Sequence, residues 1–222
     1  MLIHSEKTHF LHINVEDDII REIPIRDDIG KNPSLCNLNN GLILFIGGQN
    51  SENVFTFDLS TSFFEFVGKM STVRYGAYAI KYNQTVYICG GVNKENDNTL
   101  EIEYFNLNKH YEIKSVKFEN SYLLRKINPL CFEVGSGEMF LVCGGYCLFD
   151  QTDTVCFVQA DKLNAQVSNI NMPKPITCFN PNTLQYKGFY YFFGEEEENE
   201  IYKFSEYHKS FTRIKKDDIT FI

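Results

Sequence analysis

Four apolar segments of the sequence end in glycine at nearly regular intervals, and this repeat restricts the possible folds more than any other feature. Three of the segments end in Gly-Gly: "LILFIGG" (42–48), "TVYICGG" (85–91) and "MFLVCGG" (139–145). Their first glycines, Gly47, Gly90 and Gly144, are 43 and 54 residues apart, and another 50 residues lead to Gly194 at the end of "FYYFFG". The sequence therefore predicts four copies of one structural unit of roughly 45–50 residues.

A second pattern follows each of these glycines. After a polar loop come a short apolar stretch, a turn, and a second stretch that opens with a large residue. Phe57 precedes Phe64 by seven residues, and the other matching pairs are Phe105 with Tyr111, Phe204 with Phe211 and, more weakly, Val158 with Ala165. Because another apolar segment, such as "YGAYAIKY" (75–82), precedes the glycine segment, each unit is predicted to contain four short strands.

Units of this kind favour a β-propeller. A sheet of four short strands cannot cover its own faces, but radial stacking against neighbouring sheets buries both of them. Glycine at a strand end permits positive φ angles and close approach of two backbones, and large aromatic residues can pack between blades. The structural positions of the repeat are then Gly47, Gly48, Gly90, Gly91, Gly144, Gly145, Gly194, Phe64, Tyr111 and Phe211. With 20 Phe and 13 Tyr among 222 residues, the predicted fold is an all-β propeller of four-stranded antiparallel blades.

We predict a single domain over residues 1–222, or a fragment of a propeller. The expected blades span about 34–68, 75–117, 130–170 and 177–216, after a leading half-unit at 10–26. "DDITFI" (217–222) could add a strand to the half-unit, which would give a five-bladed ring with an incomplete closing blade. The preferred alternative is a larger propeller, or completion by another segment or chain, because an unpaired strand edge promotes aggregation.

The segment at 56–91, "TFDLSTSFFEFVGKMSTVRYGAYAIKYNQTVYICGG", resembles the repeat of the Kelch β-propeller family. It has an aromatic-Asp pair (Phe57-Asp58), Phe64 at the place of the family's tryptophan, and Tyr87 before Gly90-Gly91. The resemblance covers nearly the whole chain in about four and a half repeats. The chain departs from the family pattern in having no Trp and in carrying Glu195 where the fourth unit should have its second glycine.

The charge and the cysteine content indicate the kind of environment that suits the chain. A formal net charge of −8 disfavours nucleic acid and anionic membranes as partners. No apolar stretch is long enough to insert into a membrane, and the N-terminus does not read as a secretory signal. The chain has seven cysteines, and this odd number does not suggest a disulfide framework. We expect a cytoplasmic protein, with possible association to the cytoskeleton as one alternative.

No motif of the sequence indicates catalysis, a cofactor or a metal. Cys89 and Cys143 hold the same repeat position before Gly-Gly, so they belong to different blades and are expected to pack rather than to bind a metal together. The histidines form no ligand pattern. We therefore expect no enzyme activity, no cofactor and no metal site.

The candidate partner-binding residues lie in the segments and loops between strands. They are Arg74, Tyr75, Arg125, Lys126, Tyr146, Glu195 and Glu196. Arg and Tyr are enriched at binding hot spots, although Arg74 could equally be a structural residue of the segment between two blades. The loops "QNSENV" (49–54), "VNKENDNTLE" (92–101) and "YCLFDQTDT" (146–154) are further candidates, since loops on a rigid scaffold often carry function.

The resemblance implies a non-enzymatic scaffold or adaptor for protein–protein interaction, or a structural subunit of a larger, for example cytoskeletal, complex. Kelch-like domains also serve as substrate-recognition modules of ubiquitin ligases, which is the main alternative. A copper-dependent propeller enzyme of the galactose oxidase type is the third and least favoured alternative.

Overall fold

The structure is a computed structural model of the chain. It describes residues 2–5, 9–14, 19–24, 26–38, 40–95, 97, 101–109, 112–134, 139–147, 150–174, 184–186, 188–193 and 201–214. For residues 2–5, 9–14, 19–21, 139–141, 146–147, 150–151, 171, 184–186 and 193 it describes the backbone alone.

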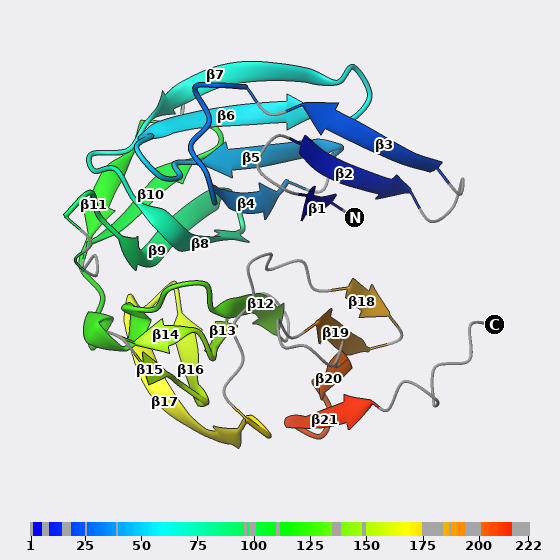
Figure 1. Cartoon of the computed structure of the whole chain (residues 1–222). Helices are drawn as coiled ribbons and strands as arrows, with labels where there is room; N and C mark the ends of the chain where they lie inside the picture. Colours follow the sequence, from blue (N-terminus) through cyan, green and yellow to red (C-terminus); the bar gives the residue numbers. More distant parts are fainter. Residues whose placement is uncertain are drawn as a thin grey trace.

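Four antiparallel sheets of four strands form the blades of a β-propeller (Figure 1). The first blade consists of β4 (Ser34–Asn37), β5 (Leu42–Ile46), β6 (Asn53–Asp58) and β7 (Phe63–Lys69). The second consists of β8 (Tyr75–Tyr82), β9 (Thr85–Val92), β10 (Ile102–Asn106) and β11 (Lys114–Val116). The third consists of β12 (Leu130–Val134), β13 (Met139–Cys143), β16 (Thr154–Gln159) and β17 (Asn164–Asn171). The fourth consists of β18 (Leu184–Tyr186), β19 (Phe189–Phe193), β20 (Ile201–Ser205) and β21 (Ser210–Ile214). The all-β propeller with four-stranded antiparallel blades is thereby confirmed.

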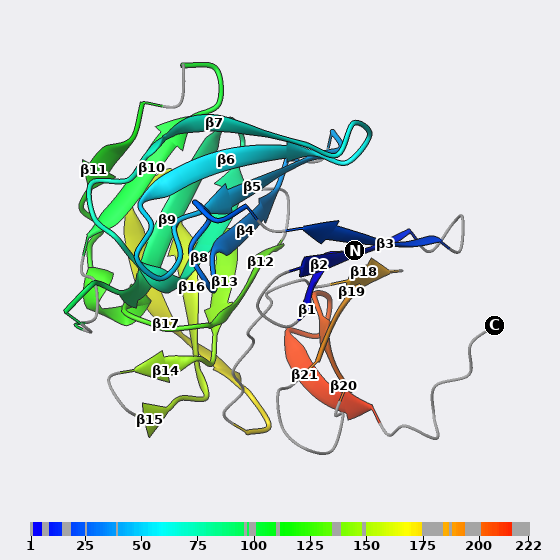
Figure 2. The same cartoon turned by 45° about the horizontal axis from the view of Figure 1, so that its top comes forward.

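A three-stranded sheet precedes the first blade. It contains β1 (Leu2–Ser5), β2 (His9–Asn14) and β3 (Ile19–Pro24), in that order. The sequence predicted only the part that contains β2 and β3, so β1 is an additional strand. Ile23 of β3 is buried in one cluster with residues of the first blade, and the two sheets lie side by side in Figures 1 and 2. The terminal segment 217–222, proposed as a closing strand, lies outside the described residues.

Two smaller elements accompany the blades. The hairpin of β14 (Tyr146–Cys147) and β15 (Asp150–Gln151) leaves the third blade between β13 and β16 and projects from it in Figure 2. A short 3-10 helix, η2 (Ser121–Leu124), lies between the second and third blades and buries Leu124.

Within the described residues, each junction between blade-forming sheets that follow one another in the chain encloses its own hydrophobic cluster. The cluster between β1–β3 and the first blade includes Ile23, Phe45, Phe57 and Phe64. The next three clusters join the first blade to the second (Leu44, Met70, Val86, Phe105), the second to the third (Tyr78, Cys89, Val142, Cys156) and the third to the fourth (Phe132, Cys143, Phe192, Phe204). The core is therefore a series of interfaces rather than a single centre.

The alternation of side chains along a strand explains this series. Successive residues of a strand point to opposite faces of the sheet. In β5, Ile43 and Phe45 join the cluster on the N-terminal side of the blade, whereas Leu44 and Ile46 join the cluster shared with the second blade. Since both faces are covered, the strand reads as a continuous apolar run instead of an alternating pattern.

The large residues of the repeat pack toward the preceding sheet. Phe57, Phe105 and Phe204 are each 0% exposed and belong to the cluster shared with the sheet before their own blade. Phe64 is 8% exposed and contacts Phe45 and Phe57 with ring centroids 5.1 and 4.5 Å apart. Ala165 occupies the equivalent buried place in the third blade.

Phe211 of the fourth blade is partly buried and packs against Phe192 and Phe204. Tyr111, the corresponding residue of the second blade, lies outside the described residues, as does Gly194.

The glycine pairs adopt positive φ angles in all three complete copies. The angles are 66° and 108° at Gly47 and Gly48, 63° and 79° at Gly90 and Gly91, and 63° and 80° at Gly144 and Gly145. A Cβ atom added to Gly91 would lie 2.8 Å from both Ala77 N and Tyr75 O. The pair is thus required for its backbone angles and for the close approach of the first strand of the same blade.

A line of hydrogen bonds connects the inner ends of three blades. Asn32, Gly76 and Asn128 occupy equivalent positions at or just before the start of successive first strands, and all three have positive φ. The amide of Asn128 donates to Gly76 O at 2.8 Å, and the amide of Gly76 donates to Asn32 O at 3.5 Å. The blades are therefore linked by their backbones as well as by their apolar faces.

Replacing Gly91 by Ala should destabilise the protein by at least about 2 kcal/mol, because strain at positive φ adds to a backbone clash. Gly41→Ala is the matched control, since Gly41 has the same φ of 79° but no atom within 4 Å of an added Cβ. The free energy of unfolding from urea titrations measures both variants. Equal losses for the two would show that the close approach at Gly91 contributes nothing.

Phe64→Ala should cost about 3–5 kcal/mol of unfolding free energy, because it leaves a cavity between two sheets. Phe66→Ala in the same strand, where the ring is 52% exposed, should cost less than about 1 kcal/mol. Chemical denaturation of both variants tests the interface. A small effect of Phe64→Ala would contradict the assigned packing of the repeat.

Candidate functional site

One end of the propeller carries the glycine pairs, and we call it the glycine end. Here the glycine pairs terminate the second strands, and the first and third strands of each blade begin. The predicted loop 49–54 and the segments before β4, β8 and β12 all lie at this end, because neighbouring strands of a blade are antiparallel. A partner that docks at the glycine end would meet these segments first.

Arg74 lies at the glycine end but is not available to a partner. Its side chain is 0% exposed, and Nη2 forms an ion pair of 2.8 Å with Glu103 Oε2, which is also 0% exposed. Nη1 donates to Glu101 O at 2.9 Å, and the amide of Ser71 donates to the other carboxylate oxygen of Glu103 at 2.6 Å. The interpretation of Arg74 as a partner-binding residue is corrected: it is a buried structural arginine.

Burial lowers the pKa of the Arg74 guanidinium, and the adjacent Glu103 carboxylate opposes this shift. An arginine retains its proton under such conditions because its ordinary pKa is very high. The pair is therefore a true ion pair in the interface between the first two blades. Gly48 N of the first blade also donates to Arg74 O at 2.9 Å. Arg74 therefore forms hydrogen bonds with both the first and the second blade.

Lys126 is the corresponding residue before the third blade. It is 3% exposed, and its Nζ donates to Thr154 O at 2.6 Å. Its carbonyl accepts a hydrogen bond of 2.8 Å from Gly91 N, in the same way as Arg74 O accepts from Gly48. The expectation that Lys126 binds a partner is likewise corrected, because its ammonium group is used inside the protein.

Tyr75 and Arg125 are partly exposed. Tyr75 begins β8 and pairs with Val92. Arg125 follows η2 and, together with Lys117, Ser121 and Glu101, lines a shallow pocket of about 460 Å³ beside β11. These two residues remain compatible with binding, but the structure does not bring them into one cluster with the other candidates.

A hollow at the glycine end lies on the first blade. It is an open pocket of about 780 Å³ formed by the segment 26–31, the loop 49–53 and Lys69. The loop belongs to the predicted candidate "QNSENV". Ser51 Oγ and Asn53 Nδ2 donate to Asp28 O at 3.0 and 3.2 Å, so loop and segment form one rigid wall.

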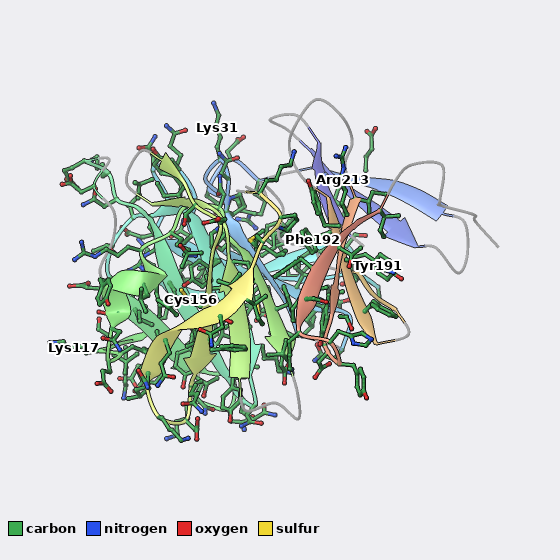
Figure 3. All side chains as sticks on the ribbon, turned by 90° about the horizontal axis from the view of Figure 1, so that it is seen from below. Lys31, Lys117, Cys156, Tyr191, Phe192 and Arg213 are labelled. Atoms are coloured by element: carbon green, nitrogen blue, oxygen red, sulfur yellow. The ribbon has the colours of Figure 1, made fainter. Side chains whose placement is uncertain are left out.

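Charged residues of both signs surround this pocket. Arg26 pairs with Asp28 at 2.9 Å, and Lys69 pairs with Glu52 at 2.9 Å. The Arg26 guanidinium holds the pKa of the Asp28 carboxyl below its ordinary value. Lys31 is exposed and extends away from the ribbon in Figure 3. The pocket is thus polar, accessible and already lined by paired ions.

The segment 26–30 was not among the candidates from the sequence. A signal was present, however. Gly30 stands where the later blades carry the basic residues Arg74 and Lys126, a correspondence that becomes clear once the strand registers are aligned. Of the other candidates, Glu195 and Glu196 lie outside the described residues, and only the backbone of Tyr146 is described.

The cysteines with described side chains contribute to packing. Cys36, Cys89, Cys143 and Cys156 are buried, and Cys131 is half-buried. Burial raises the pKa of the Cys36 and Cys89 thiols to about 12, so both are protonated and unreactive at neutral pH. Within the described residues, no group of three or more His, Cys, Asp or Glu side chains is arranged to hold a metal ion. The described part of the chain also has no helix of a length and apolarity suited to crossing a bilayer.

Neither a scan against models of known protein families nor a search of the curated proteins finds a match. The propeller fold and the geometry of the glycine end are therefore the features from which a function can be inferred.

Removing one partner of the buried ion pair should be costly. Arg74→Met leaves Glu103 unpaired between two blades and should lower the unfolding free energy by about 3–5 kcal/mol. Arg74→Met combined with Glu103→Leu should recover much of this loss. The control is Lys69→Met, which removes an exposed pair and should cost no more than about 1 kcal/mol. Urea unfolding compares the variants, and similar losses for Arg74→Met and Lys69→Met would refute a structural role for the pair.

Proposed function

We propose that this chain is a divergent Kelch-type β-propeller that acts as a non-enzymatic scaffold or adaptor and binds other proteins through its glycine end. The Kelch assignment is supported by the glycine pairs at the ends of the second strands and by the aromatic residues that follow them, in blades of four strands. A subunit of a larger protein assembly is the biological setting that such a scaffold suits best.

The open polar pocket on the first blade is the observation that carries this proposal. It measures about 780 Å³, and its walls are strand-anchored loops rather than free segments. Loops held by a rigid scaffold are favourable for recognition, because little conformational entropy is lost on binding. The exposed residues at its mouth, such as Lys31 and Gln49, supply polar contacts of the kind found at the rim of protein interfaces.

The test is a comparison of two double variants in affinity purification from an extract of the cells that make the protein. Gln49→Arg with Asn50→Arg adds bulk and positive charge at the glycine end. Gln84→Arg with Asn83→Arg makes the same chemical changes in an exposed turn at the opposite end of the blades. Proteins bound by the unaltered chain are quantified by mass spectrometry.

We expect the glycine-end variant to lose its main partner at least about tenfold, which corresponds to roughly 1.4 kcal/mol of binding free energy, and the opposite-end variant to retain it. Retention of the partner by both variants, or equal loss from both, would contradict docking at the glycine end. Circular dichroism and thermal unfolding establish that both variants are folded.

A further inference from the structure

The three blades with a glycine pair differ at one position in the segment that leads into the first strand. This difference indicates which kind of side chain the pocket on the first blade can bind. In the first two blades, the residue after the second glycine pairs with a residue at or just before the start of the first strand: Gln49 with Lys31 and Val92 with Tyr75. Extending the register of β12 with β13 aligns Tyr146 with Ile127 in the third blade. The residues that precede these partners, Gly30, Arg74 and Lys126, are therefore equivalent.

In the second and third blades, this position supplies a buried cation to a fixed backbone acceptor. Arg74 Nη1 donates to Glu101 O, and Lys126 Nζ donates to Thr154 O. The two acceptors are equivalent to each other. Glu101 lies two residues before Glu103, which pairs with Ile88. Thr154 lies two residues before Cys156, which pairs with Val142. The same register in the first blade, where Phe55 pairs with Phe45, identifies Asn53 O as the third member of the set.

The first blade has no basic side chain at this position. Gly30 has no side chain, and a Cβ atom placed on it would lie 2.5 Å from the carbonyl carbon of Gly48. Backbone atoms of Gly48 and Gln49 occupy the space directly beside Gly30, and both Gly30 and Asn53 line the pocket. Asn53 O accepts a hydrogen bond from Gly47 N at 2.8 Å, and a carbonyl oxygen has capacity for a second one.

The electrostatic surroundings suit a cation that comes from outside. Three cationic residues line the pocket. Arg26 and Lys69 are paired with their own carboxylates, and Lys31 extends outward (Figure 3). Asp27 lines the same pocket, and no ion pair to its carboxylate occurs within the described residues. The formal charge of −8 on the whole chain also attracts a basic partner.

We infer that the pocket on the first blade receives a lysine or arginine side chain of a bound protein, which takes the position held internally by Arg74 and Lys126 in the next two blades. Asp27 and Asn53 O are its acceptors. This inference depends on the proposed function in one respect, namely that the cation arrives on a partner protein. The recognition chemistry itself is a property of the isolated chain.

The first experiment uses small probes instead of a partner. Nα-acetyl-arginine N-methylamide and Nα-acetyl-lysine N-methylamide are titrated into the protein, and backbone amide shifts are followed by NMR. The citrulline analogue, which is neutral and nearly isosteric with arginine, is the probe control. We expect saturable shifts at Gly48, Ser51 and Asn53 with millimolar affinity, and affinity about tenfold weaker for citrulline, because a charge-assisted hydrogen bond is lost.

The protein variants are Asp27→Asn and, as the matched control, Asp161→Asn in an exposed turn at the opposite end. Asp27→Asn should weaken both charged probes about tenfold, and Asp161→Asn should leave them unchanged. Absence of saturable shifts, shifts centred elsewhere on the surface, equal binding of citrulline, or indifference to Asp27→Asn would each overturn the inference.

The two proposals can fail separately. If the purified partner still binds the Asp27→Asn variant with unchanged affinity, the glycine end remains a docking surface but the cation pocket is refuted. If the charged probes bind as described and the glycine-end double variant retains its partner, the pocket stands and the proposed docking at the glycine end fails.

Discussion

The need to cover both faces of every four-stranded sheet governs this structure. The first three blades have no interior of their own, because their buried side chains are divided between the cluster before each blade and the cluster after it. Leu44 and Phe45 are neighbours in sequence, yet they stabilise different interfaces. A blade is thus stabilised through the interfaces that it shares with its neighbours, and its stability is inseparable from theirs.

The interfaces are not chemically uniform, and the first junction between complete blades shows why. Glu103 occupies the strand position that holds Phe55, Cys156 and Tyr202 in the other blades, as the strand registers show. A carboxylate there requires a partner, and Arg74 supplies it from the segment that leads into the same blade. Because an unpaired charge in such a place is strongly unfavourable, this interface specifies its own geometry more narrowly than an apolar one.

Much of the fold could be predicted from the sequence, because the glycine pairs and the aromatic residues after them depend on local backbone geometry and on strand alternation. "YGAYAIKY" corresponds to β8 from end to end. The destination of long polar side chains was not predictable in the same way. Arg74 and Lys126 look like surface residues in sequence, and only the position of Glu103 within an apolar strand hinted at burial. β1 lacks a glycine pair, so no repeat signal identified it. The pocket was not predicted either, because its interpretation depends on the absence at Gly30 of the basic side chain found at Arg74 and Lys126.

The backbone hydrogen bonds that run from Asn128 to Gly76 and from Gly76 to Asn32 have a mechanical consequence. They join three blades at their inner ends, near the first strands. A second backbone connection lies at the outer strands of the second and third blades, where Glu119, after β11, bridges Asn164 of β17. The second and third blades are therefore tied at both their inner and their outer strands, and this double connection restricts hinge motion between them.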